Sequence, residues 1–228
     1  MKMPLTLLAA ALLACSPVAA NAQQGAPEGR LAQLYAARPP AGSAFVRVLN
    51  PGATALKVAV GNGADQSIGP ATRATRYAIV EGGKPFPVRV AGKPRTQGQV
   101  AAGTFTTLVL DPATPSRPLG VLADGGGSSD ALKAEIRFYN LATGCAQARL
   151  AMADKGAVVF PAVAAGASSA RAINPVKARL VAGCGGKDSL PVALPSLQPG
   201  DHYSLFLTGS ASAPVLQGQL SGTDPVGR

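Results

Sequence analysis

Aromatic residues and histidine are scarce in this 228-residue sequence. It has no tryptophan, only 4% of its residues are aromatic, and it contains a single histidine, His202. A carbohydrate-binding module that stacks sugar rings on aromatic side chains is therefore disfavoured. One histidine without a cluster of cysteines or carboxylates also makes a poor set of metal ligands. The sequence predicts no metal site and no cofactor.

Charged residues are also few. They make up 14% of the sequence, with 11 acidic residues against 21 Lys and Arg and a net charge of +10. Long solvated helices need charged outer faces and are not expected, and a glycosidase pair of carboxylates is hard to find among so few acids. The basic residues are scattered singly with no aromatic run among them, so nucleic acid is not an expected partner. Their long-range field favours attraction to polyanions such as an acidic polysaccharide.

Turn-forming residues, in contrast, are abundant. The sequence has 27 Gly and 20 Pro, yet its hydrophobic fraction of 47% is too high for a disordered chain. Short alternating apolar segments recur between the Gly- and Pro-containing turns, which is typical of β-sandwiches and open barrels. We therefore predict an all-β fold. The predicted strands lie at residues 44–49, 56–60, 76–80, 86–90, 104–110, 134–139, 146–152, 157–160, 176–181, 190–194 and 203–207.

The N-terminus has the features of a secretory signal peptide. A basic start precedes an apolar run at residues 5–14, and an A-x-A motif ends at Ala22, after which we expect cleavage. The apolar run has about ten residues, half of the roughly 20 that are needed to span a bilayer. An alternative is a lipobox that ends at Cys15, which would leave a lipidated cysteine on the membrane. In either case we expect export to the periplasm.

Two cysteines, Cys145 and Cys184, remain after removal of the signal peptide. In an oxidising compartment such a pair tends to form a disulfide, and only one intramolecular pairing exists. A disulfide between them would close a loop of about 39 residues. In the simple chain-entropy model this stabilises the fold by roughly 3–4 kcal/mol. Neither cysteine has the spacing of a redox or zinc site, so we predict a structural disulfide.

Two segments of the chain repeat. Residues 44–50 align with 134–140, and residues 103–110 align with 200–207, at offsets of 90 and 97 residues. An opening and a closing strand that both repeat indicate two copies of one domain. We therefore expect two tandem, internally duplicated β-sandwich domains joined by a Gly/Ser linker. The predicted organisation is a signal peptide at 1–22, an extended segment at 23–42, a first sandwich at 43–111, a linker at 112–130 and a second sandwich at 131–228.

Arg47 and Arg137 occupy equivalent positions in the two opening strands. Their neighbours along each strand are apolar and should face the core, which leaves both arginines on the opposite face. One interpretation is a solvated strand face with the aliphatic stems packed against the sheet. The other is a matched pair of basic contacts for a carboxylate or a partner protein.

The segment Lys187-Asp188-Ser189-Leu190 is similar to the Gly-Asp-Ser-Leu nucleophile segment of SGNH esterases and acetyltransferases. Its context differs, because that serine follows a parallel strand and opens a helix, and an Asp-x-x-His pair supplies the base. Here Asp201 directly precedes His202, and adjacent strand residues point to opposite faces. A working triad at Ser189 is therefore not expected.

A family resemblance covers most of the chain. Residues 34–35, Pro40, residues 42–48 (GSAFVRV) and Asn50 resemble the start of the periplasmic alginate O-acetylation proteins of the AlgF family, and residues 171–177 (RAINPVK) are similar to their Ile-Asn-Pro-Val segment. The resemblance implies a non-catalytic accessory protein built of two β-sandwiches. It would bridge a membrane-bound O-acyltransferase and periplasmic SGNH-type acetyltransferases of an exopolysaccharide, alginate in the first place. The related accessory proteins of bacterial cellulose acetylation are the alternative.

The segment that leads into the first domain is the predicted partner contact. Leu34 and Tyr35 are apolar and precede Arg38-Pro39-Pro40, a stiff stretch that cannot fold back as a helix. These two side chains must either dock on their own sandwich or be presented to a partner, with Arg47 beside them. The candidate partner-binding residues are thus Leu34, Tyr35, Arg47 and Arg137.

Overall fold

The computed structural model describes residues 38–111, 114, 118–125, 130, 132–154 and 156–226. All regular elements in this part of the chain are β-strands, which confirms the all-β fold class. Among the described residues, no helix is long and apolar enough to cross a membrane. The signal peptide, its cleavage site at Ala22, and Leu34 and Tyr35 lie outside the described residues.

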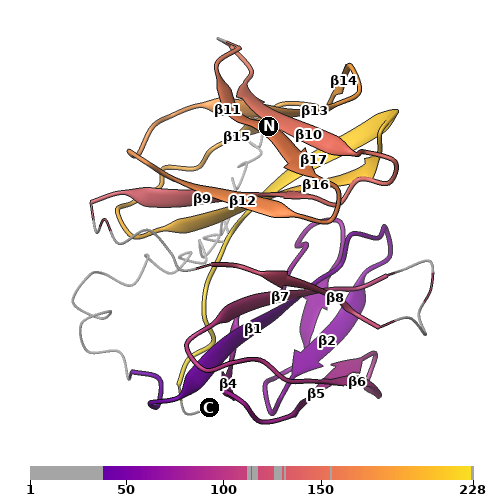
Figure 1. Cartoon of the computed structure of the whole chain (residues 1–228), viewed down its shortest axis with the longest axis vertical. Coiled ribbons are helices and arrows are strands. Elements are labelled where there is room, and N and C mark those ends of the chain that lie inside the picture. Colours follow the sequence, from indigo (N-terminus) through magenta and orange to yellow (C-terminus); the bar gives the residue numbers. More distant parts are fainter. Residues whose placement is uncertain are drawn as a thin grey trace, which may run out of the picture. The chain divides into compact units, whose positions relative to one another are not determined.

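Two four-stranded sheets form the first sandwich (Figure 1). One sheet has the order β4-β1-β7-β8, with β1 at Ser43–Leu49, β4 at Ala78–Glu81, β7 at Phe105–Val109 and β8 at Gly120–Ala123. The other has the order β3-β2-β5-β6, with β2 at Leu56–Val60, β3 at Gln66–Ile68, β5 at Phe86–Val90 and β6 at Lys93–Gly98. Val46 and Val48 of β1 pack against Val58 and Val88 of the facing sheet, and all four are fully buried.

The second sandwich is built in the same way. One sheet has the order β12-β9-β16-β17, with β9 at Ala134–Asn140, β12 at Ser168–Ile173, β16 at His202–Ser210 and β17 at Ala213–Leu220. The other has the order β11-β10-β13-β14, with β10 at Gln147–Met152, β11 at Val158–Ala164, β13 at Arg179–Cys184 and β14 at Lys187–Asp188, and the short β15 at Val192–Ala193 also pairs with β13. Cys145 and Cys184 form a disulfide in the core between these sheets, as predicted.

The strand orders show the internal duplication directly. In each copy the first strand pairs in parallel with the strand that closes the domain, β1 with β7 and β9 with β16. The register is also the same, because Phe45 lies opposite Phe105 and Glu135 lies opposite His202. These are the residues that the two sequence alignments place at equivalent positions. The sandwiches are therefore two copies of one topology.

The structure corrects the extent of the linker expected at 112–130. Strand β8 lies inside this range and forms an antiparallel hairpin with β7, so it belongs to the first sandwich. Strands β3, β6, β12, β14 and β17 were also not among the predicted strands. All five are edge strands: β3 and β14 have only two or three residues, β6 and β12 have few large apolar ones, and in β17 the apolar Val215 and Leu216 are adjacent, so they carry little of the apolar alternation that marks a strand.

Candidate functional site: the junction of the two sandwiches

The outer faces of β1 and β9 are covered as well as their inner faces. Leu49 of the first sandwich forms a buried apolar cluster with Ala74 and with Tyr139 and Phe206 of the second. The rings of Tyr139 and Phe206 lie 5.1 Å apart. The sheets β4-β1-β7-β8 and β12-β9-β16-β17 therefore share a third core, and the two sandwiches contact one another through it.

Arg47 lies at the centre of this junction and is 1% exposed. Its Nε donates to Thr107 Oγ1 at 2.8 Å, and its Nη1 donates to Ser221 Oγ at 3.0 Å. Its Nη2 donates to Tyr139 OH at 2.5 Å and to Ser204 Oγ at 3.0 Å. Three of these four acceptors belong to the second sandwich or to the segment after it. The guanidinium thus joins the two copies.

Asp124 supplies the matching negative charge and is 3% exposed. Tyr77 OH donates to its Oδ2 at 2.7 Å, Tyr139 OH donates to its Oδ1 at 2.6 Å, and Thr107 also donates to Oδ2. The Nε of Arg47 lies 4.0 Å from Oδ2. A buried ion pair is tolerated when its polar atoms are bonded in this way. Asp124 therefore holds tyrosines from both sandwiches.

The pKa values of Arg47, Tyr77 and Tyr139 determine which of these groups are protonated at neutral pH. Burial lowers the pKa of the Arg47 guanidinium, but Tyr139, Tyr77 and Asp124 outweigh it and the pKa lies above its ordinary value. Burial raises the pKa of Tyr139 to about 12 and raises that of Tyr77 still further. Both phenols are therefore protonated donors at neutral pH, and Arg47 is a permanent cation whose guanidinium lies 4.6 Å from the Tyr77 ring centre.

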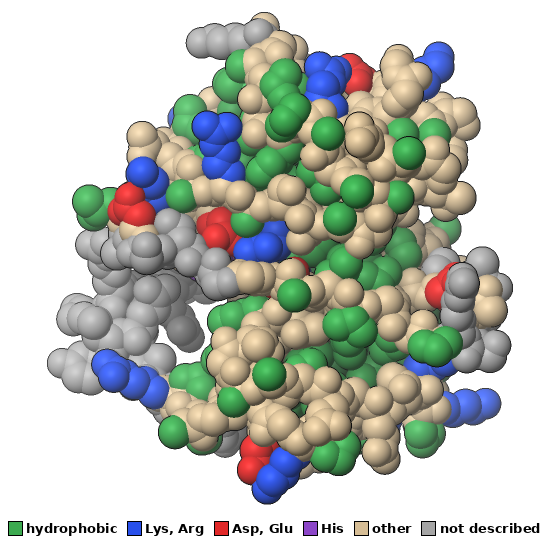
Figure 2. Space-filling view, in the orientation of Figure 1, with side chains coloured by type: hydrophobic (Ala, Val, Ile, Leu, Met, Phe, Trp, Pro, Cys, Tyr) green, Lys and Arg blue, Asp and Glu red, His purple; other side chains and the backbone are tan. Residues whose placement is uncertain are grey.

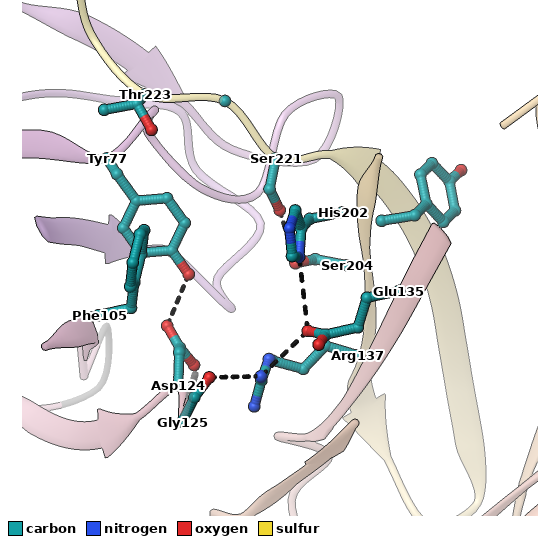
Figure 3. Close-up of a pocket in the computed structure, with 12 residues that line it drawn as sticks. Tyr77, Phe105, Asp124, Gly125, Glu135, Arg137, His202, Ser204, Ser221 and Thr223 are labelled. Carbon is teal, nitrogen blue, oxygen red and sulfur yellow. Dashed lines mark hydrogen bonds and ion pairs between the residues drawn. The ribbon is translucent and has the colours of Figure 1, made fainter. Parts of the chain in front are cut away.

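A cavity of about 270 Å³ opens beside this network (Figure 3). Tyr77 and Phe105 line one side, and Glu135, Arg137 and His202 line the other (Figure 3). Arg137 Nη2 donates to Glu135 Oε1 and to the carbonyl of Gly125, both at 3.0 Å. His202 Nδ1 lies 3.6 Å from the same Glu135 oxygen. The rim of the junction thus places Arg137, Glu135 and the His202 imidazole opposite two aromatic rings.

The segment after β17, residues 221–226, returns to the first sandwich. Tyr77 N–H donates to Gly222 O and Asp224 N–H donates to Tyr77 O, both at 2.8 Å, which forms a parallel bridge between Tyr77 and Thr223. Arg76 forms an ion pair with Asp224 at 3.5 Å. We call residues 221–226 the C-terminal segment. It adds backbone hydrogen bonds to the side-chain contacts of the junction.

The structure contradicts one interpretation of the paired arginines. Arg47 does not lie on a solvated strand face, because the second sandwich covers that face. Arg137, at the equivalent position of β9, has an 11% exposed side chain at the rim of the cavity. The structure does not test whether Arg47 or Arg137 contacts a partner protein. Partner contacts of these two residues, and of Leu34 and Tyr35, stay predictions.

Three candidate catalytic side chains lie in a row across β9, β16 and the end of β17. Glu135 is paired with His202, and Ser221 N–H donates to His202 O at 2.8 Å. The Ser221 hydroxyl bonds to Arg47 and, at 2.9 Å, to Ser204 Oγ. Ser189 is separate and 7% exposed, and its hydroxyl donates to Leu190 O and accepts from Ala182 N–H. In neither case does the hydroxyl bond to the imidazole in this arrangement.

Asp124, Tyr77 and Tyr139 were not among the site residues predicted from the sequence. Asp124 lies at the start of a Gly/Ser-rich stretch and was assigned to the linker, because nothing local distinguishes a buried aspartate from a solvated one. Tyr139 did carry a signal. It follows the inward-facing Phe138, and Phe206 lies between two inward-facing leucines, so these strands are apolar on both faces. Such strands are expected to be covered on both sides.

Comparisons with known proteins agree on one family. The profile of the family described as "Alginate O-acetyl transferase AlgF" matches residues 10–204. The chain is 30% identical over 185 residues to the "Alginate biosynthesis protein AlgF" of Pseudomonas putida KT2440, which covers 81% of this chain and 82% of that protein.

The chain belongs to the AlgF family. The resemblance noted in the sequence is therefore confirmed, and family membership supports a role in alginate biosynthesis and acetylation. The solved C-terminal domain of AlgF from P. aeruginosa is 28% identical, with a TM-score of 0.35, and the match covers 39% of this chain and 98% of that domain.

Proposed function

We propose that this chain is a non-catalytic periplasmic adaptor needed for the O-acetylation of an exopolysaccharide, alginate in the first place. It would hold periplasmic SGNH-type acetyltransferases and a membrane-bound O-acyltransferase together. The family match over residues 10–204 is the observation that carries the proposal. The junction supports it, because a chain whose two sandwiches share a core can present two partners in a fixed arrangement.

The disulfide and the N-terminus support the location. Cys145 and Cys184 are bonded, and such bonds persist in oxidising compartments such as the periplasm. The apolar run and the A-x-A motif that ends at Ala22 have the features of an export signal. Periplasmic acetyltransferases would be accessible to the chain there.

A second candidate function is acyl transfer by the chain itself. The family description names a transferase, and Glu135, His202 and Ser221 lie side by side at the cavity. Against it, the Ser221 hydroxyl is bonded to a buried arginine and to Ser204 rather than to a base. A nucleophilic serine needs a general base within hydrogen-bond reach. The adaptor role is therefore the better supported of the two.

Which polymer is acetylated is one question, and whether the positive charge of this chain helps to bind that polymer is another. A cellulose acetylation system would use the same adaptor chemistry with a neutral polymer. Figure 2 shows Lys and Arg side chains scattered over the drawn face rather than gathered into one patch. Any attraction to alginate through this charge should weaken from low to moderate salt, whereas binding in a shaped site should persist, and titration calorimetry with alginate oligosaccharides distinguishes the two.

Binding and turnover assays on the purified protein test the proposal. The chain should bind the SGNH-type acetyltransferase of its own polysaccharide system directly and should not hydrolyse an aryl acetate above background. Ser189→Ala and Ser221→Ala should leave both results unchanged. Turnover that Ser221→Ala abolishes at an unchanged melting temperature would establish the enzyme instead, and no complex with the transferase would contradict the adaptor.

A further inference from the structure

The C-terminal segment occupies only part of the free edge of β4. It pairs in parallel with Tyr77, the residue before β4, and among the described residues this backbone pairing stops at Asp224. Ala78–Glu81 continue beyond that point as an edge strand of the sheet β4-β1-β7-β8. The protein's own chain thus adds one parallel bridge at the start of this edge.

The backbone of Ile79 faces the remaining part of this edge. In an antiparallel ladder, two opposite residues either bond to one another or both point away. Ile79 lies opposite Phe45, whose N–H donates to Thr104 O on the side of β7 at 2.8 Å. The N–H and C=O of Ile79 therefore point away from β1, in the same direction as those of Tyr77. The edge offers the next donor and acceptor beyond the C-terminal segment. The N–H of Glu81, which lies opposite Ser43, points the same way, whereas its C=O already accepts from Lys84 N–H at 3.3 Å.

Most other sheet edges of the described chain have features that discourage strand addition. Native proteins protect edges with proline, with basic side chains or by keeping the strand short. Strand β4 has neither proline nor a basic residue, and its one charged residue is Glu81 at its end. The four-residue β8 is similar, but it carries no added strand. The protected edges are β6 with Lys93, Pro94 and Arg95, β11 with Pro161, β12 with Arg171, β17 with Pro214, and the very short β3 and β14.

A groove of about 480 Å³ runs beside β4. Val60 and Phe86 line it from the facing sheet, and Pro225 and Val226 line it from the C-terminal segment. An extended peptide added to a sheet edge gains backbone hydrogen bonds, and it places alternate side chains in pockets beside the edge. Glu81, Lys84 and Asp224 also line the groove, so only its apolar part is suited to apolar side chains on one face of such a peptide.

We propose that the open edge of β4 at Ile79 and Glu81 is a docking site for an extended, apolar segment of a partner protein, which adds as a strand next to the C-terminal segment. The proposal rests on the adaptor function, since the partner is the acetyltransferase that the adaptor holds. The C-terminal segment is the occupant of the adjoining part of the same edge, and the partner strand continues that pairing.

Proline substitutions at the edge test the proposal, with the purified full-length mature chain and its SGNH-type acetyltransferase as the probe. Ile79→Pro and Glu81→Pro each remove an outward N–H and should raise the Kd of the complex at least about tenfold. The matched control is Ala172→Pro in β12. Ala172 lies opposite Glu135 as Ile79 lies opposite Phe45, so it has the equivalent edge position in the second copy. Its Kd should stay within about twofold of the wild type.

The outcomes separate this proposal from the adaptor function. If both β4 variants bind like the wild type, or Ala172→Pro weakens binding equally, the edge site is wrong and the adaptor stands. If the wild-type chain does not bind the transferase, the adaptor function itself fails. Should the β4 variants melt at lower temperature, hydrogen exchange of the wild-type chain decides: the Ile79 amide should slow on complex formation, and unchanged exchange overturns the site.

Discussion

Arg47 and Arg137 occupy the same position in two copies of one domain, yet their environments differ. Arg47 is 1% exposed and donates to four side chains, three of them beyond the first sandwich. Arg137 lies at the rim of a cavity, where it bonds to Glu135 of its own strand and to Gly125. The duplication placed an arginine on the outer face twice, but the packing of the copies buries only one.

The difference shows how a tandem duplication becomes a single body. The outer faces of β1 and β9 contact one another, but equivalent residues do not lie opposite each other. Arg47 of the first copy bonds to Tyr139 of the second, two residues after the equivalent Arg137. The first sandwich supplies the cation and Asp124 balances it from the segment that leaves β8. An adaptor with this junction holds its two halves at a fixed distance, whereas a flexible tandem would not.

Removing the buried arginine should have the largest effect. Arg47→Met leaves Asp124 buried without its cation and should lower the free energy of unfolding by about 3–5 kcal/mol. Urea unfolding of the disulfide-bonded protein measures this loss. The double variant with Asp124→Leu, which removes both charges, should recover part of it. If Arg47→Met costs no more than Arg137→Met, the two arginines are equivalent in energy and the comparison fails.

The disulfide should give the next largest effect, and it is confined to the second copy. Replacing Cys145 and Cys184 by Ala opens a loop with a sequence separation of 39 residues. In the chain-entropy model this costs roughly 3–4 kcal/mol. Hydrogen exchange should show the loss in β10 and β13, with the amides of β2 and β5 less affected. Equal loss of protection in both sandwiches would mean that the junction makes them unfold together.

Alkaline pH should weaken the junction because of its tyrosines. The folded-state pKa of Tyr139 is raised to about 12 by burial, so the folded chain holds this proton more tightly than the unfolded chain. Stability should therefore be fully present below an unfolded pKa of about 10 and fall as the pH rises towards 12. The urea midpoint measured between pH 9 and 12 checks this, and Tyr139→Phe should flatten its decline. A wild-type midpoint independent of pH would be inconsistent with the buried phenol.

The smallest effect is expected at the rim. Arg137→Met removes a largely buried ion pair with Glu135, whose carboxylate also lies 3.6 Å from His202 Nδ1, and should cost about 1–3 kcal/mol. The same variant sharpens the functional comparison, since Arg137 is the accessible member of the pair. If it contacts the acetyltransferase, Arg137→Met raises the Kd of the complex measured well below the melting temperature of the variant. Unchanged affinity would remove Arg137 from the candidate contacts.

Much of the fold was accessible from the sequence because alternation is a local property. Residues 44–50 and 134–140 repeat both the inward apolar positions and the outward arginine, so the side chains of β1 and β9 that face the core were predicted correctly. The disulfide was predicted because two cysteines allow one pairing. The edge strand β6, with Lys93 and Pro94, could not be found in this way, since it is held by backbone pairing rather than by apolar side chains.

The junction was less accessible because it depends on what covers an outer face. The long aliphatic stem of an arginine suits both a solvated face and a buried hydrogen-bond network, and Arg47 lies in a buried network. Asp124 bonds to Tyr77 and Tyr139, which are 47 and 15 residues away, so no local pattern links them. Only the continuous apolar character around Phe138 and Tyr139 indicated that β9 is buried on both sides.

The acetyl content of the polymer tests the central claim most directly. In a strain that lacks this gene, the account predicts that exopolysaccharide is still made but carries few or no acetyl esters. The wild-type gene and the Ser189→Ala and Ser221→Ala variants should all restore the esters, because the chain acts by holding other proteins. Fully acetylated polymer in the deletion strain would contradict the adaptor, and failure of a well-folded Ser221→Ala variant to restore the esters would contradict its non-catalytic character.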